Sequence, residues 1–147
     1  MAKCGEVMTR EPACCEPGDT IQHAAQLMKT EDVGSLPVVQ SETNRTVVGI
    51  VTDRDVVVKV VADGRALQNA SVRDAMTQNP VTVRDDDDVN RALSAMADRK
   101  VRRIPVVDAE GRLCGIIAQA DIATRLHRDK TTGDLVEAIS EPQTVRK

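Results

Sequence analysis

The sequence predicts a mixed α/β protein in which two copies of a strand–helix–strand–strand–helix unit pack sheet against sheet. Three observations predict this class: an internal repeat, a helical spacing of apolar residues early in each copy, and two short β-branched strands after that helix. We place the first unit at residues 1–68, the second at 69–128, and a tail with a short amphipathic helix at 129–147.

The internal repeat is the strongest signal in the chain. Residues 7–39 align without a gap on residues 75–107, and ten of the 33 aligned positions are identical. A second block follows, because residues 49–56 (GIVTDRDV) align with residues 115–122 (GIIAQADI). Repetition on this scale indicates two copies of one unit of roughly sixty residues.

Each copy has a first helix with one apolar face. The apolar residues follow the i, i+3, i+4, i+7 spacing, as Ile21, Ala24, Ala25 and Met28, and again as Val89, Ala92, Leu93 and Met96. Asp19 and Asp87 precede these helices and are predicted as their N-caps. The spacing of Ser71 and Asp74 predicts a capping box that opens the second unit.

The later elements of each copy follow from β-branched runs. Strands are expected at residues 37–39 and 105–107, each followed by a polar turn and a second apolar strand at 46–51 or 113–117. A second helix then begins near Asp53 or Gln119. In the first copy this helix carries the run VVVKVVA, and we expect it to be buried except at Lys59.

Composition narrows the possible functions. The 147 residues include 20 basic and 23 acidic side chains, a formal charge of -3, and no Phe, Tyr or Trp. This balance gives no large positive field, and no base-stacking platform exists, so we expect no nucleic-acid partner and no membrane surface. The absence of a long apolar run or signal peptide predicts a cytoplasmic protein.

Neither a metal site nor an active site is expected. Cys14 and Cys15 are adjacent and would point to opposite faces of a strand, and neither histidine has a ligand spacing to a cysteine. The acidic run 85–88 is explained by complementation of a helix dipole. Because no Ser/His/Asp set, Walker loop or GxGxxG is present, we do not expect an enzyme.

The repeated residues resemble the CBS (cystathionine-β-synthase-type) domain family, in the form of a stand-alone tandem pair. The resemblance covers residues 5–127 and rests on the VMT and AMT openings, the LPVV and IPVV strands, and the blocks GIVTDRD and GIIAQAD. It implies two symmetry-related clefts between the repeats, adenine-nucleotide or adenosyl ligands, and dimerisation. Because no enzyme or channel is attached, it also implies a separate protein partner.

The first cleft is predicted around the block from Gly49 to Asp55, which fits the family's nucleotide motif. Thr52 ends a strand where a helix begins, so its hydroxyl and the free N–H groups can meet phosphate. Asp55, one turn on, can accept both ribose hydroxyls. Thr-x-x-Asp is also a capping box, so the residues alone leave a ligand site and a helix cap both open. The cleft residues expected from motif and resemblance are Gly49, Ile50, Thr52, Arg54, Asp55, Leu36, Pro37, Thr77, Val81 and Thr82.

The second cleft departs from the motif. Ala118 stands where the hydroxyl residue is expected, while Asp121 keeps the ribose position. Arg102 and Arg103 precede the strand, where the family often places a cation for phosphate, or they are solvated charges. The other residues expected there are Thr9, Ala13 and Cys14. We therefore expect two unequal clefts, the second being weaker.

These observations predict a regulatory module that binds AMP, ADP, ATP, NAD or S-adenosylmethionine and passes its state to an unidentified protein. Apart from that regulatory ligand no cofactor is expected, and we expect a homodimer. Aliphatic side chains such as Ile50, Val81 and Leu36 would hold the adenine, since the chain has no aromatic residue. The alternative is a homodimeric scaffold that binds no ligand.

Overall fold

The computed structural model describes residues 2–125, and the tail at 129–147 lies outside the described residues. The chain forms two compact units. One comprises Ala13–Pro80, and the other joins the residues up to Pro12 to those from Val81 onward. Among the described residues, no helix is long and apolar enough to span a bilayer.

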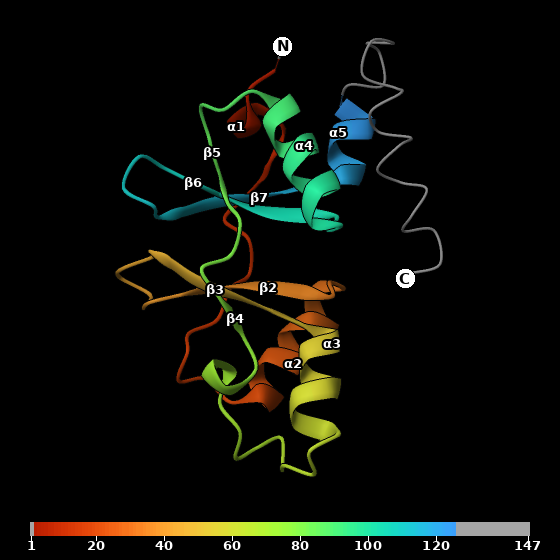
Figure 1. Ribbon diagram of the computed structural model, residues 1–147. Coiled ribbons are helices and arrows are strands. Elements are labelled where there is room, and N and C mark those ends of the chain that lie inside the picture. The colour runs from red at the N-terminus through yellow and green to blue at the C-terminus, as the bar shows by residue number, and fades with distance from the viewer. Residues whose placement is uncertain (1, 126–147) are drawn as a thin grey trace. The chain divides into compact units, whose positions relative to one another are not determined.

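The unit Ala13–Pro80 is a three-stranded antiparallel sheet in the order β2-β3-β4, with α2 and α3 on one face (Figure 1). Its elements are α2 (Ile21–Glu31), β2 (Ser35–Val39), β3 (Val47–Thr52), α3 (Asp53–Val56), the π-helical η1 (Val57–Val61), the 3₁₀ turn η2 (Val72–Asp74) and β4 (Thr77–Gln78). The predicted hairpin and the predicted start of the second helix at Asp53 are confirmed.

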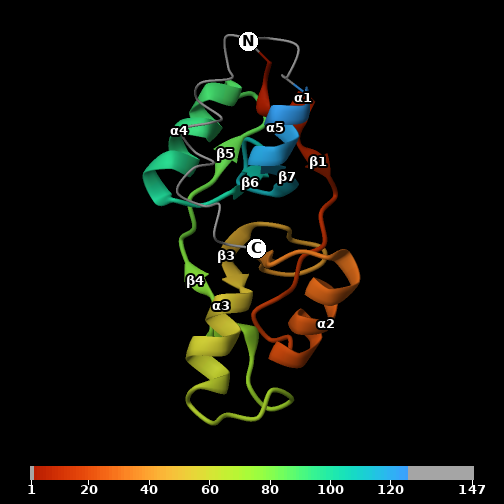
Figure 2. The same ribbon diagram turned by 90° about the vertical axis from the view of Figure 1, so that its right-hand side faces the viewer.

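The other unit has a four-stranded sheet in the order β1-β7-β6-β5, in which β5 and β6 are parallel and the β1–β7 and β6–β7 pairs are antiparallel. Figure 2 shows α4 and α5 together on one face of this sheet. Its elements are α1 (Cys4–Val7), β1 (Thr9–Arg10), β5 (Val83–Arg84), α4 (Val89–Arg99), β6 (Arg103–Val107), β7 (Leu113–Ala118) and α5 (Gln119–Arg125). The mixed α/β class follows from these two helix-covered sheets.

The opening Met-Thr segment of each repeat pairs with the hairpin of the other repeat. Thr9 in β1 lies opposite Ile116 in β7, and Thr77 in β4 lies opposite Ile50 in β3. Each compact unit therefore combines the hairpin and helices of one repeat with the first strand of the other. The units differ in this respect from the sequence division into 1–68 and 69–128.

The apolar faces predicted for the first helices form the cores, except that Ala25 is only half-buried. The predicted N-caps are wrong by one residue, because Thr20 and Asp88 cap α2 and α4. The carboxylates of Asp19 and Asp87 instead accept the backbone N–H three residues earlier, each at 2.8 Å, and close the preceding turn.

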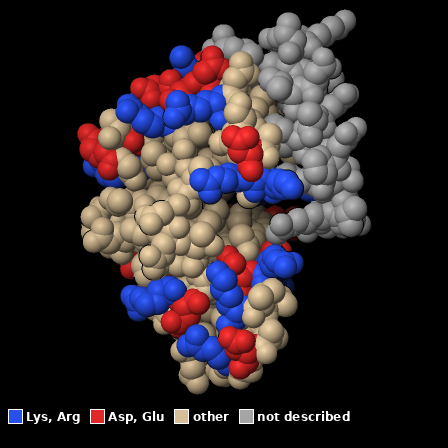
Figure 3. All heavy atoms as spheres, in the orientation of Figure 1, with Lys and Arg blue, Asp and Glu red and all other residues tan. Residues whose placement is uncertain are grey.

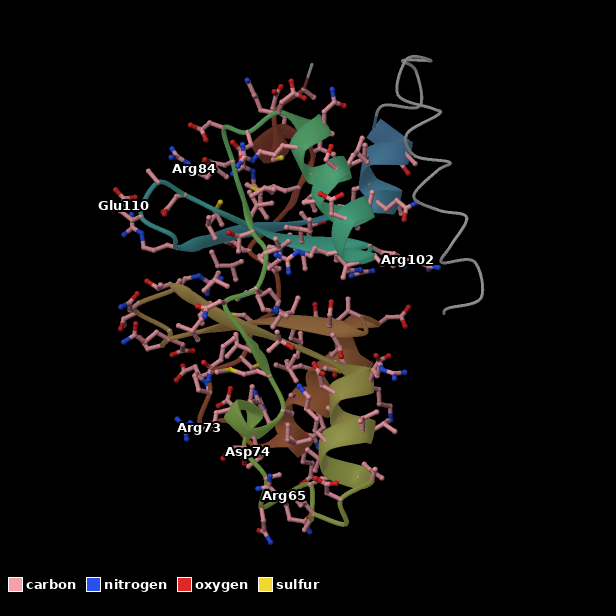
Figure 4. The ribbon with its side chains drawn as sticks, in the orientation of Figure 1. Arg65, Arg73, Asp74, Arg84, Arg102 and Glu110 are labelled. Atoms are coloured by element: carbon pink, nitrogen blue, oxygen red, sulfur yellow. The ribbon has the colours of Figure 1, made fainter. Side chains whose placement is uncertain are left out.

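The predicted capping box at Ser71 is confirmed. One carboxylate oxygen of Asp74 accepts the Ser71 N–H at 3.0 Å and a guanidinium N–H of Arg65 at 3.0 Å (Figure 4). The Ser71 N–H, followed by Arg65, lowers the pKa of Asp74 below its ordinary value. This box opens η2, which leads the chain into β4 of the same unit.

Candidate functional site

The motif predicted for the first cleft forms the turn between β3 and α3. Thr52 is the N-cap of α3, and its Oγ1 accepts the Asp55 N–H at 3.0 Å. In return, Oδ2 of Asp55 accepts the Thr52 N–H at 3.0 Å. The capping box that the spacing allows is therefore formed, and it fixes the Asp55 side chain against the end of β3.

Lys59, one turn after Asp55, completes this arrangement. Its Nζ lies 3.3 Å from Asp55 Oδ1 and donates to the Ala75 carbonyl oxygen at 2.9 Å. The side chain is 43% exposed, as the sequence predicts, but its ammonium group is held between two segments. The expectation that the rest of this helix is buried is wrong, because Val57, Val58 and Val61 are exposed.

The acceptor capacity of Asp55 decides what this turn can bind. A carboxylate offers about four lone-pair sites, two on each oxygen. Thr52 uses one site on Oδ2, and Lys59 uses one on Oδ1. About one acceptor site per oxygen is left, and the Asp55 side chain is 16% exposed. Two acceptors about 2 Å apart match the two hydroxyls of a vicinal diol, so capping and ligand binding are compatible at this residue.

The strand residues of the predicted cleft divide between the two faces of the sheet. Leu36 is 1% exposed and packs in the core beneath the helices, opposite Val51. Pro37 and Ile50 lie opposite one another on the other face, where Pro37 is buried and Ile50 is half-buried. Leu36 is a core side chain and Pro37 is buried as well, so the half-buried Ile50 is the accessible apolar candidate on this strand pair.

The remaining residues of the first cleft lie in different places. Arg54 is exposed on the first turn of α3, and Thr77 is exposed on β4 opposite Ile50. Val81 and Thr82 belong to the other unit, where both are half-buried and Val81 packs against that unit's core. Of the predicted residues, Thr52, Arg54, Asp55, Ile50 and Thr77 belong to the Ala13–Pro80 unit, and Val81 and Thr82 do not.

The second motif forms only one of the two hydrogen bonds of the Thr52–Asp55 capping box. Asp121 Oδ2 accepts the Ala118 N–H at 3.3 Å, but the buried Ala118 offers no hydroxyl in return. The turn is otherwise the same, because the Arg102 carbonyl oxygen accepts the Gln119 N–H at 2.8 Å, as the Gly34 oxygen accepts the Asp53 N–H at 2.9 Å.

The other residues predicted for the second cleft are spread over both units. Arg102 directly precedes β6 (Figure 4). Arg103 begins this strand, and both side chains are half-buried. Thr9 is exposed on β1. Ala13 and Cys14 are half-buried and belong to the other unit.

Two of the four cysteines, Cys4 and Cys15, have the surroundings of packing residues. Cys4 and Cys15 are buried in the two cores, and desolvation raises the pKa of their thiols to about 11 and about 12.

Within residues 2–125, no three His, Cys, Asp or Glu side chains are grouped as metal ligands. On the face drawn in Figure 3, acidic and basic side chains are intermixed.

Comparison with known proteins places this geometry in a family. The CBS domain model matches residues 4–62 and 72–128, which is most of the chain, and the chain belongs to the CBS domain family as a tandem pair. It is 37% identical to protein YlbB of Bacillus subtilis over 96% of this chain and 93% of that protein. It is also 37% identical to protein MK0525 of Methanopyrus kandleri over 80% of this chain, but spans only 59% of that protein's length.

Solved structures show the same fold with adenosine compounds bound. CBSX2 in complex with AMP is 28% identical, with a TM-score of 0.76 over 88% of this chain and 99% of that one. CBSX2 comes from Arabidopsis thaliana. The CBS domain pair of protein MJ0100, in complex with 5′-methylthioadenosine and S-adenosylmethionine, is 25% identical with a TM-score of 0.75, over 88% of this chain and 99% of that one.

Proposed function

We propose that this protein is a regulatory module that binds an adenine nucleotide or related adenosyl compound at the Thr52–Asp55 turn and reports its occupancy to a partner protein. The observation that carries the proposal is the state of Asp55, whose two oxygens are each fixed by one donor and each keep one acceptor site. A ribose diol needs two such acceptors side by side.

Two further observations support an adenosine ligand. The relatives of known structure include one bound to AMP and one bound to methylthioadenosine and S-adenosylmethionine. In this chain the half-buried Ile50 supplies an apolar side chain on the helix-free face of the strand pair that ends at Thr52. We expect Ile50 to contact the base.

The role we propose is regulatory and not catalytic. The chemistry gathered at the turn consists of a hydroxyl, a carboxylate and an ammonium group that bind and orient a ligand. A bound ligand changes the conformation of the protein only through the difference in its affinity for two arrangements. We propose that this change is read by a separate cytoplasmic protein.

The test is a thermal-shift series with AMP, ADP, ATP, NAD and S-adenosylmethionine on the wild type, Asp55→Asn and Asp63→Asn. Asp55→Asn keeps an oxygen for the cap but loses charge and one acceptor, so it should lose the ligand response. Asp63 is an exposed acid of the same unit, and its variant should respond as the wild type does. At a ligand concentration of 100 Kd, the expected stabilisation of the wild type is about 2.7 kcal/mol. A flat response of the wild type to every compound would reject the proposal.

A second candidate is a homodimeric scaffold, and the exposed valines favour it. Val57, Val58 and Val61 are 57%, 48% and 52% exposed along one helix, which makes an apolar strip that a second copy could cover. Sedimentation of the wild type and of Val58→Asp with Val61→Asp separates the candidates. Under the scaffold hypothesis the wild type is a dimer, the variant is a monomer, and no nucleotide changes either.

A further inference from the structure

We propose that Lys59 sets the ligand class of the Thr52–Asp55 turn, favouring adenosine ligands that carry a phosphate over neutral or cationic adenosyl compounds. This inference rests on the proposed function, and it goes beyond it by naming the residue that selects among the candidate ligands. The structures of relatives contain both kinds, since AMP is an anion and S-adenosylmethionine carries a sulfonium cation.

The argument begins with the charges of the turn. Its first helical turn carries two acids, Asp53 and Asp55, and one exposed base, Arg54. Without a nearby cation the Asp55 carboxylate would repel a phosphate bound beside it. The Lys59 ammonium, 3.3 Å from that carboxylate, offsets its charge. A dianionic ligand can then approach the turn, and the attraction for a sulfonium cation is reduced.

The position of Lys59 is fixed from two sides. It pairs with Asp55 within the helix, and it donates at 2.9 Å to the carbonyl of Ala75, sixteen residues further along the chain. An ammonium group has three N–H donors, so these two acceptors leave one for a ligand or for water. The side chain is 43% exposed, and a ligand bound to Asp55 would therefore meet both the charge and the remaining donor.

The same two contacts distinguish Lys59 from an ordinary surface lysine. A flexible exposed pair contributes little, because ordering two long side chains offsets the attraction. Here the Ala75 carbonyl holds the ammonium beside Asp55 before any ligand arrives. Part of the entropy cost of placing a positive charge next to a bound phosphate is thus already met by the fold.

The experiment measures Kd by calorimetry for AMP, adenosine and S-adenosylmethionine on the wild type, Lys59→Met, Lys59→Arg and Lys29→Met. The wild type should bind AMP most tightly. Lys59→Met should weaken AMP about tenfold, leave adenosine within about twofold, and improve S-adenosylmethionine. Lys59→Arg should restore most of the preference for AMP. Lys29 is an exposed lysine on α2 of the same unit, and its loss should change none of the ratios.

A salt titration checks the inference on the wild type alone. Raising the ionic strength from about 0.1 M to about 1 M shortens the screening length from about 10 Å to about 3 Å, and should reduce the preference for AMP over adenosine. If Lys59→Met weakens AMP and adenosine by equal factors, or if the wild type prefers S-adenosylmethionine, the inference is overturned while the proposed function stands. If the wild type binds none of the three compounds, the proposed function itself fails.

Discussion

Met76 lies directly against Gly49 of β3. A Cβ built on Gly49 would stand 2.9 Å from the Met76 sulfur and 2.9 Å from the Thr77 carbonyl oxygen. The other unit has the same arrangement, in which a Cβ on Gly115 would collide with the Met8 side chain. The glycine that opens each nucleotide-type motif thus has a packing role, since it leaves room for the methionine that opens the other repeat.

This contact predicts that Gly49→Ala is destabilising. The added methyl group meets a backbone oxygen that β4 pairing holds in place, so relief requires a shift of the strand. We expect a loss of about 1–3 kcal/mol in the free energy of unfolding, measured by urea denaturation. Gly18→Ala is the matched control, because a Cβ there meets nothing within 4 Å, and it should change stability by less than about 0.5 kcal/mol. Equal effects of the two substitutions would contradict the packing role.

The exchange of opening segments predicts an unusual effect of truncation. Deleting residues 1–12 removes part of the first repeat in sequence, but it takes β1, Cys4, Val7 and Met8 from the core of the second repeat. Hydrogen exchange should accelerate in β7 while β3 stays protected. Faster exchange in β3 with β7 unchanged would show that the opening segment supports its own repeat.

The regular elements could be predicted from the sequence, whereas this exchange could not. The helices α2 and α4 and the strands β2 and β6 follow from local spacing and β-branched runs, which do not depend on the partner. Local spacing does not determine which hairpin the Met8 and Met76 segments pair with. Both segments read Met-Thr, and both hairpins offer a glycine at the facing position, so local patterns fit either pairing.

Lys100 gives a prediction about backbone strain. It ends α4 in the left-handed region with φ 56°, a conformation that costs a residue with a side chain more than it costs glycine. Lys100→Gly should therefore raise the free energy of unfolding by about 0.5–1 kcal/mol. Lys29→Gly, inside the right-handed helix α2, should lower it by about 1 kcal/mol. Loss of stability in both variants would contradict the strain at Lys100.

The thiols predict a graded reactivity. Burial holds the pKa of Cys4 near 11 and that of Cys15 near 12, so at pH 8 both are protonated as well as shielded. Iodoacetamide should modify the half-buried Cys14 first, with Cys4 and Cys15 reacting only on unfolding, as peptide mass spectrometry would show. Rapid labelling of Cys15 in the folded protein would contradict its burial.

The same thiols make stability depend on alkaline pH. Because the folded-state pKa of Cys15 is raised above the unfolded value of about 8.5, its contribution is complete below that value and declines as the pH rises toward about 12. Between pH 8 and pH 10, Cys15→Ala should therefore lose less stability than the wild type. An equal loss in both proteins would assign the alkaline decline to other groups.

At the candidate site the sequence predicted the components but not their full use. The Thr52–Asp55 spacing allowed a cap or a ligand site, and the lone-pair count at Asp55 shows that the two are compatible. The i, i+4 spacing of Asp55 and Lys59 was a signal for their pairing. The bond from Lys59 to the Ala75 carbonyl depends on tertiary packing, which no local pattern encodes.

The most direct test of the account is a calorimetric cycle that removes the ribose diol and its acceptor separately and together. AMP and 2′,3′-dideoxy-AMP are titrated into the wild type and into Asp55→Asn. We predict that AMP binds the wild type, that removing either the diol or the carboxylate weakens binding by at least about tenfold, and that removing both costs little more than removing one. If dideoxy-AMP binds the wild type as tightly as AMP does, Asp55 does not hold the sugar, and the account is contradicted.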